Sequence, residues 1–157
     1  MSVFVSVVGP GDASPKQVAD AETVGRLLAG ADAIVVCGGR GGVMEAACRG
    51  ALEEGGITVG LLPDADRRQA NPFLTVSIPT GMGELRNGLV ARAGDAVIAI
   101  GGEFGTLSEI AFALKLGRPV VGLGTWELAR GGAEVQAFEV ADGPQEAVAR
   151  ALALVRA

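Results

Sequence analysis

The chain has 157 residues, of which 49% are hydrophobic and 20% charged, and its formal net charge at neutral pH is −5. This length fits one domain, residues 1–157, and the hydrophobic fraction excludes an intrinsically disordered chain. The absence of histidine excludes a Ser-His-Asp triad and an imidazole-based zinc site, so carboxylates must do any acid–base work. The acidic balance disfavours a nucleic-acid partner, which needs basic patches.

The sequence also predicts where the protein works. Residues 1–8 lack a basic leader, and no apolar run reaches the ~20 residues of a membrane span. We therefore expect a cytoplasmic protein with no membrane partner. Cys37 and Cys48 lack the spacing of a metal site, and both are expected to be reduced core residues.

Apolar runs and helical patterns alternate along the chain without a linker or a repeat. The apolar runs predict buried strands over residues 3–8, 33–37, 57–62, 74–78, 95–100 and 119–123. Amphipathic spacing predicts helices over residues 15–29, 43–51 and 82–93, a helix that the turn at residues 101–105 opens and that carries apolar positions from 107 to 114, and a last helix from 144 onward. The first helix has the clearest start, because Ser14, Pro15 and Gln17 form a capping box. Residues 63–72 are expected to form a mobile loop, and residues 135–140 a weak last strand.

The strand runs before the tail are continuously apolar, as in parallel strands that are buried on both faces. We therefore predict an α/β fold. It would be a doubly wound, Rossmann-like parallel sheet in three layers, with helices on both faces and one nucleotide-binding domain.

Three strand-to-helix turns are rich in glycine: residues 38–42, 80–83 and 101–105. Open parallel sheets bind ligands beyond the carboxyl ends of their strands, where helix N-termini point free N–H groups outward. Turns gathered at that edge suit a phosphate group. Neither a P-loop nor a dinucleotide-binding fingerprint is present, so a P-loop NTPase is excluded and nicotinamide-dependent oxidoreduction is disfavoured.

Two of these turns open segments that resemble a known family. Residues 38–46 (GGRGGVMEA) and 101–109 (GGEFGTLSE) look like the paired motifs of the Lonely Guy (LOG) superfamily, often labelled lysine decarboxylase-like. The resemblance covers residues 3–124 and is nearest to a bacterial subgroup related to molybdenum-cofactor carrier proteins. It implies a phosphoribohydrolase that cleaves the N-glycosidic bond of a purine nucleoside 5′-monophosphate, and a homodimer or a higher homo-oligomer.

Carried over residue by residue, the resemblance implies that Arg86 and Glu109 are the catalytic pair. It also implies that the phosphate or nucleotide is held by Gly38, Gly39, Gly41, Gly42, Met44, Gly101, Gly102, Gly105 and Thr106. The chain departs from the LOG pattern at Asn87, which stands in place of a lysine, at Gly101, in place of a proline, and at Glu103, in place of a glycine. An extra carboxylate at Glu103 would repel a phosphate unless it points away.

The proposed site residues also have purely structural interpretations. Residues 106–109 (TLSE) have the form of a capping box, in which Thr106 caps the helix and Glu109 bonds back to it. Arg86 fits a solvated helix residue, although no residue three or four positions away can pair with it. Weaker candidates for ligand contact are the arginines at positions 40, 67 and 68, and Trp126 and Phe138 are assigned to packing.

The motifs and the composition leave three candidate functions. The first is LOG-type phosphoribohydrolase activity, and the second is a non-enzymatic carrier or sensor of a phosphorylated pterin or nucleotide. The third, single-strand DNA handling as in the related DNA-processing protein A, is disfavoured by the acidic charge and the few aromatic residues. No metal or cofactor is expected, and lysine decarboxylation is rejected because neither Lys16 nor Lys115 lies beside a glycine turn to form a Schiff base.

Overall fold

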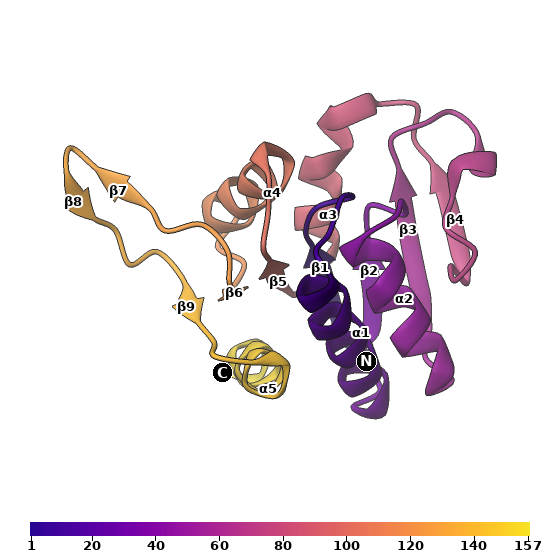
Figure 1. Ribbon diagram of the computed structural model, residues 1–157, viewed down its shortest axis with the longest axis horizontal. Helices are drawn as coiled ribbons and strands as arrows, with labels where there is room; N and C mark the ends of the chain where they lie inside the picture. The colour runs from indigo at the N-terminus through magenta and orange to yellow at the C-terminus, as the bar shows by residue number, and fades with distance from the viewer.

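The computed structural model describes residues 1–157, which form a seven-stranded parallel sheet flanked by helices (Figure 1). Its strands are β1 (Phe4–Val8), β2 (Ile34–Cys37), β3 (Thr58–Leu62), β4 (Val76–Pro79), β5 (Ala96–Ile100), β6 (Val120–Leu123) and β9 (Glu139–Val140). They lie in the order β4-β3-β2-β1-β5-β6-β9, and every neighbouring pair is parallel. The predicted doubly wound α/β fold is confirmed.

Helices cover both faces of this sheet: α1 (Pro15–Gly30), α2 (Val43–Glu53), α3 (Asn87–Ala93), α4 (Phe104–Lys115) and α5 (Pro144–Arg156). α1, α2 and α5 enclose a core of 21 buried residues, which includes Ile98 and Ile100 of β5. α3 and α4 enclose only 8, which include Val97 and Ala99, so their face of the sheet is less completely covered. The alternation along β5 places the two cores on opposite faces. None of the helices has the length and apolarity to span a membrane.

The core around α1 and α2 depends on small residues. A Cβ atom on Gly25 or on Gly50 would lie 2.0 Å from a carbonyl oxygen of the facing helix, so the two helices pack this closely only because both positions are glycine. Cys37 and Cys48 are buried and free in the same region, with their sulfur atoms 3.5 Å apart. This confirms both as reduced core residues.

The structure confirms the predicted start of α1 and corrects the predicted start of α3. The capping box of α1 is present, because the Ser14 hydroxyl accepts from the Gln17 N–H and the Gln17 side chain accepts from the Ser14 N–H. The helix expected over residues 82–93 instead begins as a 3-10 turn, η2 (Gly83–Arg86), before α3. Gly81 and Gly83 have φ angles of +65° and +58°, and these left-handed residues delay the α-helix.

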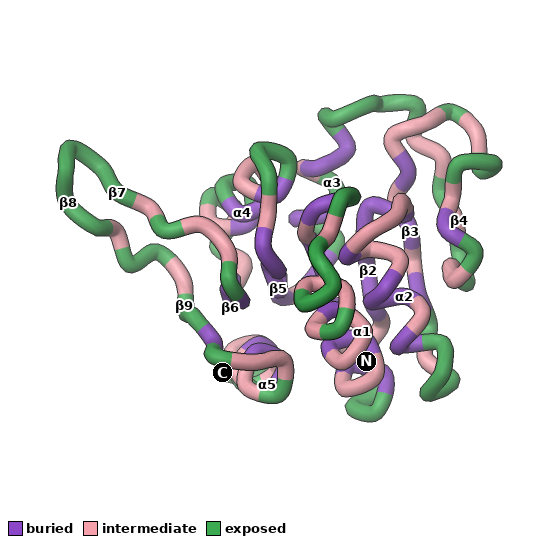
Figure 2. Tube along the Cα trace, viewed as in Figure 1, coloured by how far each residue is buried: buried purple, intermediate pink, exposed green.

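The expected strand over residues 135–140 is wrong except at its last two residues, which form β9. Before it, β7 (Ala129–Arg130) and β8 (Ala133–Glu134) form an antiparallel hairpin that projects from the body (Figure 1). Figure 2 shows that this hairpin is exposed, in contrast to the buried β5. Gly131 and Gly132 both have positive φ, as a tight two-residue hairpin turn requires, and this Gly-Gly pair was the missed signal.

The strand order reverses between β1 and β5. The chain leaves β1 for β2 on one side and reaches β5 on the other side, so the segments that follow β1 and β5 diverge at the carboxyl edge of the sheet. A crevice at such a switch point is the usual ligand site of open α/β sheets. The sequence places the segment after β5 at residues 101–105, one of the three glycine-rich turns.

Candidate functional site

A cleft of about 230 Å³ opens at this switch point. It lies between the loop after β1 and the turn after β5, and residues from η2, α2 and α4 complete its walls. The lining residues are Gly9, Pro10, Gly11, Met44, Glu84, Arg86, Asn87, Glu103, Gly105, Thr106 and Glu109. The cleft therefore brings together five of the predicted site residues: Met44, Arg86, Gly105, Thr106 and Glu109.

Arg86 is the single cation of the cleft, and its side chain is held from three sides. It ends η2 and is only 8% exposed, which overturns the solvated-helix interpretation. Its Nη2 donates to the Gly38 carbonyl at 3.2 Å, its Nη1 donates to Asn87 Oδ1, and Nη1 lies 3.6 Å from Glu109 Oε1. Nε is buried without any hydrogen-bond partner. A buried donor left unpaired is costly, and the protein supplies no acceptor for this Nε–H.

Glu109 lies in the second turn of α4 and is 6% exposed. Burial raises the pKa of its carboxyl to about 7, although the neighbouring Arg86 charge lowers it. The capping-box interpretation is wrong, because α4 begins at Phe104 and its N-cap residue is Glu103. Thr106 lies inside the helix and cannot cap it. Glu109 thus has no capping role, and a carboxyl that titrates near neutral pH can hold or release a proton in the cleft.

Asn87 connects the arginine to the start of α4. Its Oδ1 accepts from Arg86, and its Nδ2 donates to Ser108 Oγ at 3.1 Å. Ser108 Oγ in turn donates to the Gly105 carbonyl at 2.6 Å. From the sequence, Asn87 was identified only as a departure from the LOG pattern, and its position next to Arg86 was the available signal. The chain of hydrogen bonds fixes the guanidinium relative to the first turn of α4.

The first glycine turn (residues 38–42) uses its polar groups inside the protein. The Gly38 carbonyl accepts from Arg86, and the Val43 N–H at the start of α2 donates to the Pro10 carbonyl at 3.1 Å. A Cβ on Gly38 would lie 2.6 Å from the Arg86 guanidinium, so glycine is needed there. The four glycines of this turn that were predicted to hold the ligand do not line the cleft: Gly38, Gly39, Gly41 and Gly42. Met44, in the first turn of α2, does line it.

The second glycine turn (residues 101–105) faces the cleft. Gly101 and Gly102 have φ angles of +59° and +136°, so they form the bend without lining the cleft themselves. Gly105 and Thr106 do line it, in the first turn of α4. The amides of a first helical turn have no partner within the helix and lie at the positive end of its dipole. This end of the cleft can therefore bind an anion.

Carboxylates surround the single cation. Glu84, Glu103 and Glu109 all line the cleft with Arg86. Glu103 is exposed, so solvent screens its charge and weakens the repulsion expected from this residue. The arrangement favours one anionic group against Arg86 and the amides of α4. Carboxylates on the rim also suit ligand N–H donors.

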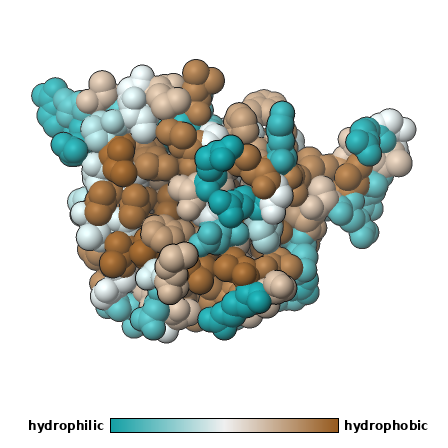
Figure 3. All heavy atoms as spheres, turned by 180° about the vertical axis from the view of Figure 1, so that it is seen from behind, coloured by the Kyte–Doolittle hydropathy of each residue, from teal (hydrophilic) through white to brown (hydrophobic).

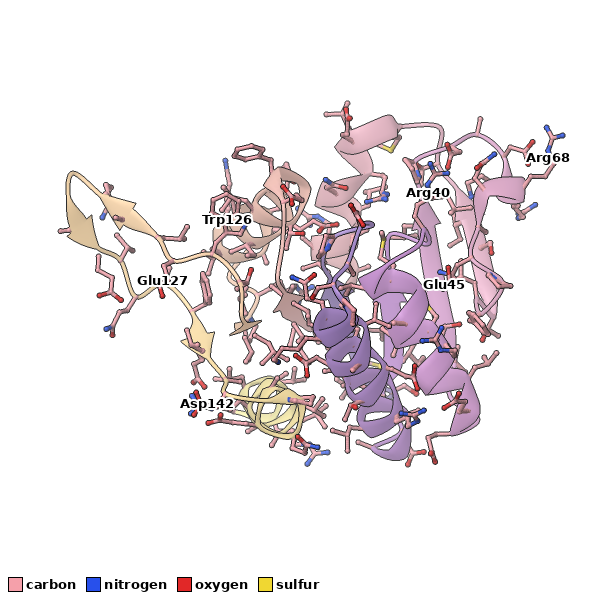
Figure 4. All side chains as sticks on the ribbon, viewed as in Figure 1. Arg40, Glu45, Arg68, Trp126, Glu127 and Asp142 are labelled. Carbon is pink, nitrogen blue, oxygen red and sulfur yellow. The ribbon has the colours of Figure 1, made fainter.

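The other arginines considered in the sequence lie outside the cleft. Arg40 Nη1 donates to Asp64 at 2.9 Å, and Figure 4 shows it on the β2–α2 side of the molecule. Arg67 and Arg68 belong to a 3-10 turn, η1 (Arg67–Gln69), inside the segment that was expected to be a loop. Arg68 points outward and pairs with Asp66. The remaining glycine-rich turn, at residues 80–83, does not line the cleft either.

The sequence profile of the SLOG cluster4 family matches residues 2–150 of the chain. An uncharacterized protein of Archaeoglobus fulgidus is 37% identical over 144 residues, which make up 92% of this chain and 91% of that protein.

Two solved structures extend this likeness to the whole fold. The molybdenum cofactor binding protein of Rippkaea orientalis has a TM-score of 0.89 and 30% identity, over 99% of this chain and 98% of that one. The molybdenum cofactor carrier protein of Chlamydomonas reinhardtii has a TM-score of 0.86 and 31% identity, over 100% of both chains. The likeness therefore includes the tail after residue 124, which the motifs did not reach.

Proposed function

The chain belongs to the SLOG cluster4 family, and from this premise we propose that it binds a small phosphorylated ligand and carries it without chemical change. The ligand class is a phosphorylated pterin or nucleotide, in the manner of the molybdenum cofactor carrier protein that the chain resembles. One observation carries the proposal: Arg86, the single cation that lines the cleft, is fixed by Gly38 and Asn87, and its buried Nε–H has no partner within the protein.

The phosphate group is proposed to lie between Arg86 and the start of α4. There it would accept hydrogen bonds from the Arg86 guanidinium and from the amides of Gly105 and Thr106, where the helix dipole adds a favourable charge. In this proposal the second glycine turn, at residues 101–105, contacts the ligand. The first glycine turn, at residues 38–42, positions Arg86 through the Gly38 carbonyl.

Thermal unfolding in the presence of guanosine 5′-monophosphate (GMP) tests the carrier proposal. We expect GMP to raise the melting temperature of the wild type, and to leave that of the Arg86→Met variant unchanged relative to the same variant without ligand. Arg40→Met is the matched control, because Arg40 is also a paired arginine but lies outside the cleft; it should keep the shift. Chromatography should recover intact GMP. Equal GMP shifts in the wild type and in Arg86→Met would refute the proposal.

The alternative is a LOG-type phosphoribohydrolase, which is favoured by Glu109. A carboxyl with a pKa of about 7, placed 3.6 Å from Arg86, suits general acid–base work on an N-glycosidic bond. The test is to incubate the protein with adenosine and guanosine monophosphates and to measure the free base. Base release by the wild type that is lost in Glu109→Gln would replace the carrier proposal. Release by Asn87→Lys alone would identify Asn87 as the residue that prevents turnover.

We also propose that the chain forms a homodimer through the less covered face of the sheet. Leu85, Leu89 and Phe112 around α3 and α4, with Val76 and Ile78 of β4, are exposed apolar residues, and Figure 3 shows apolar surface gathered on this side. Sedimentation velocity should give a dimer for the wild type and a monomer for Leu85→Asp. Leu52→Asp, an exposed leucine on α2 of the opposite face, should remain dimeric. A monomeric wild type would contradict the proposal.

A further inference from the structure

The cleft is too small for a whole nucleotide or pterin phosphate. Its volume is about 230 Å³, whereas sites that enclose a complete small ligand span roughly 300–1,000 Å³. None of its lining residues is aromatic. It can therefore take the phosphate end of a ligand, and a flat ring attached to that phosphate must lie outside it.

A second hollow borders the glycine turn at residues 101–105, which also contributes residues to the cleft. It measures about 290 Å³ and is lined by Gln17, Gly101, Gly102, Gly124, Thr125 and Trp126. Gln17 Oε1 accepts from the Ser14 N–H, which leaves its amide N–H groups as donors on the wall of the hollow. A Cβ on Gly101 would lie 2.1 Å from Gln17 Nε2, so the donor fits there only because residue 101 is glycine.

An aromatic pair lies at the turn of residues 101–105, which contributes residues to both the cleft and this hollow. Phe104, the first residue of α4, is 77% exposed, and its ring lies 5.7 Å from that of Trp126. Trp126 Nε1 donates to the carbonyl of Glu103 at 3.2 Å, and Glu103 itself lines the cleft. Figure 4 shows Trp126 beside α4. We call Phe104 and Trp126 the aromatic ledge.

The other aromatic residues do not line the cleft. Phe4 begins β1 and Phe73 precedes β4, both at the amino edge of the sheet, and Phe138 packs against the core with Trp126. Phe112 lies two turns further along α4. Trp126 packs against the core under α3 and α4, as the sequence predicted, whereas its neighbour Phe104 leaves most of its ring in solvent. An exposed aromatic group beside a polar cleft is typical of a surface on which a ligand ring stacks.

We infer that the aromatic ledge binds the flat heteroaromatic ring of the ligand, a fused pyrimidine ring system as in a purine or a pterin, while its phosphate lies against Arg86. The inference rests on the proposed function, because it requires a phosphorylated ligand in the cleft. The ring stacks on Phe104 and Trp126, its acceptors face the Gln17 amide, and its N–H groups face the Glu103 carboxylate. Stacking tolerates different rings, so the ledge sets the class of ligand, and the polar groups select within it.

Trp126 fluorescence gives a direct test, because the chain has one tryptophan and no tyrosine. The probes are GMP, whose guanine shares the amino-pyrimidinone edge of a pterin, and ribose 5-phosphate, which has the same phosphate without a ring. We expect GMP to quench the emission and to bind about tenfold more tightly than ribose 5-phosphate. Ribose 5-phosphate should bind, as measured by calorimetry, without quenching.

Variants separate this inference from the proposed function. Phe104→Ala should weaken GMP about tenfold and leave ribose 5-phosphate unchanged. The matched control is Phe73→Ala, a phenylalanine that precedes β4 at the amino edge of the sheet, which should change neither affinity. Equal affinities for both probes, with no effect of Phe104→Ala, would overturn the ledge and leave the phosphate site standing. Failure of both probes to bind the wild type would instead refute the proposed function.

Discussion

The two glycine turns that carry the family motifs look alike in sequence and do different work in the structure. In the first glycine turn, the Val43 N–H at the start of α2 is used by the Pro10 carbonyl, and the Gly38 carbonyl is used by Arg86. In the second glycine turn, the residues from Glu103 to Gly105 are exposed and the start of α4 opens onto the cleft. One turn positions a side chain, and the other presents backbone donors.

The difference follows from what packs on each helix start. The loop after β1 lies against the start of α2, where a Cβ on Gly42 would come within 2.3 Å of the Pro10 carbonyl oxygen. Nothing comparable covers the start of α4. A glycine-rich turn at the edge of a parallel sheet therefore indicates close approach of the backbone, and the approaching group is either protein or ligand. Substitutions in the two regions should separate these cases.

Removal of the positioned cation should have the largest effect. Arg86→Met should lower the free energy of unfolding by about 3 kcal/mol at pH 8, because the Glu109 carboxylate is left buried without its partner. At pH 5.5 the loss should be smaller, since Glu109 is then protonated. Urea denaturation at both pH values measures this. Equal losses at the two pH values would show that Glu109 is not charged beside Arg86.

Glu109→Gln should reveal the cost of the buried carboxyl. The pKa of Glu109 is raised from 4.5 to about 7, so the folded state binds more protons than the unfolded state between these values. Wild-type stability relative to the variant should then fall as the pH rises from 4.5 to 7. Near pH 4 the two proteins should be equally stable, and at pH 8 the variant should be more stable by up to about 3 kcal/mol. A less stable variant at pH 8 would contradict this assignment.

A matched pair of glycine substitutions compares the turns directly. Gly42→Ala should destabilise the fold by about 2 kcal/mol, because residue 42 has a φ of +65° and the new Cβ meets the Pro10 carbonyl. Gly105→Ala should change stability by less than about 0.5 kcal/mol, since its Cβ meets only the Asn87 side chain, at 3.7 Å. Chemical denaturation decides this, and similar losses at both positions would remove the distinction between the turns.

The smallest effect is expected at Asn87, which connects Arg86 to the start of α4. Asn87→Ala removes the acceptor of Arg86 Nη1 and should cost about 1 kcal/mol. It should also lower the pKa of Glu109, because the freed guanidinium can approach the carboxylate. The pH midpoint found with Glu109→Gln should therefore move downward in the Asn87→Ala background. Ser108→Ala is the control, since it leaves the contact between Asn87 and Arg86 intact and should not move the midpoint.

Local patterns predicted the elements whose signals are local. The Ser14 and Gln17 cap was predictable because both partners lie within one turn of helix. The TLSE pattern at residues 106–109 misled because the same residue types can lie inside a helix, and only the path of the chain from β5 sets where α4 begins. The Gly131–Gly132 hairpin was missed because its short strands are exposed and lack an apolar pattern.

The candidate site was predictable in part for the same reason. Arg86 and Glu109 were identified through motifs, but their pairing across 23 positions of sequence required the packing of α3 against α4. The lining by Gly9, Pro10 and Gly11 was not foreseen, because the loop after β1 resembles no ligand motif. It borders the cleft only because β1 lies next to β5 in the sheet.

The sequence by itself determined the parallel α/β architecture, since continuous apolar strands between amphipathic helices can bury their surface in few other ways. It also determined which turns allow close backbone approach, because only glycine leaves the space. The tertiary structure decided which turn faces a ligand, how Arg86 keeps one donor unpaired, and why burial raises the pKa of Glu109. These properties depend on desolvation and on contacts between distant segments, and neither exists until the sheet has assembled.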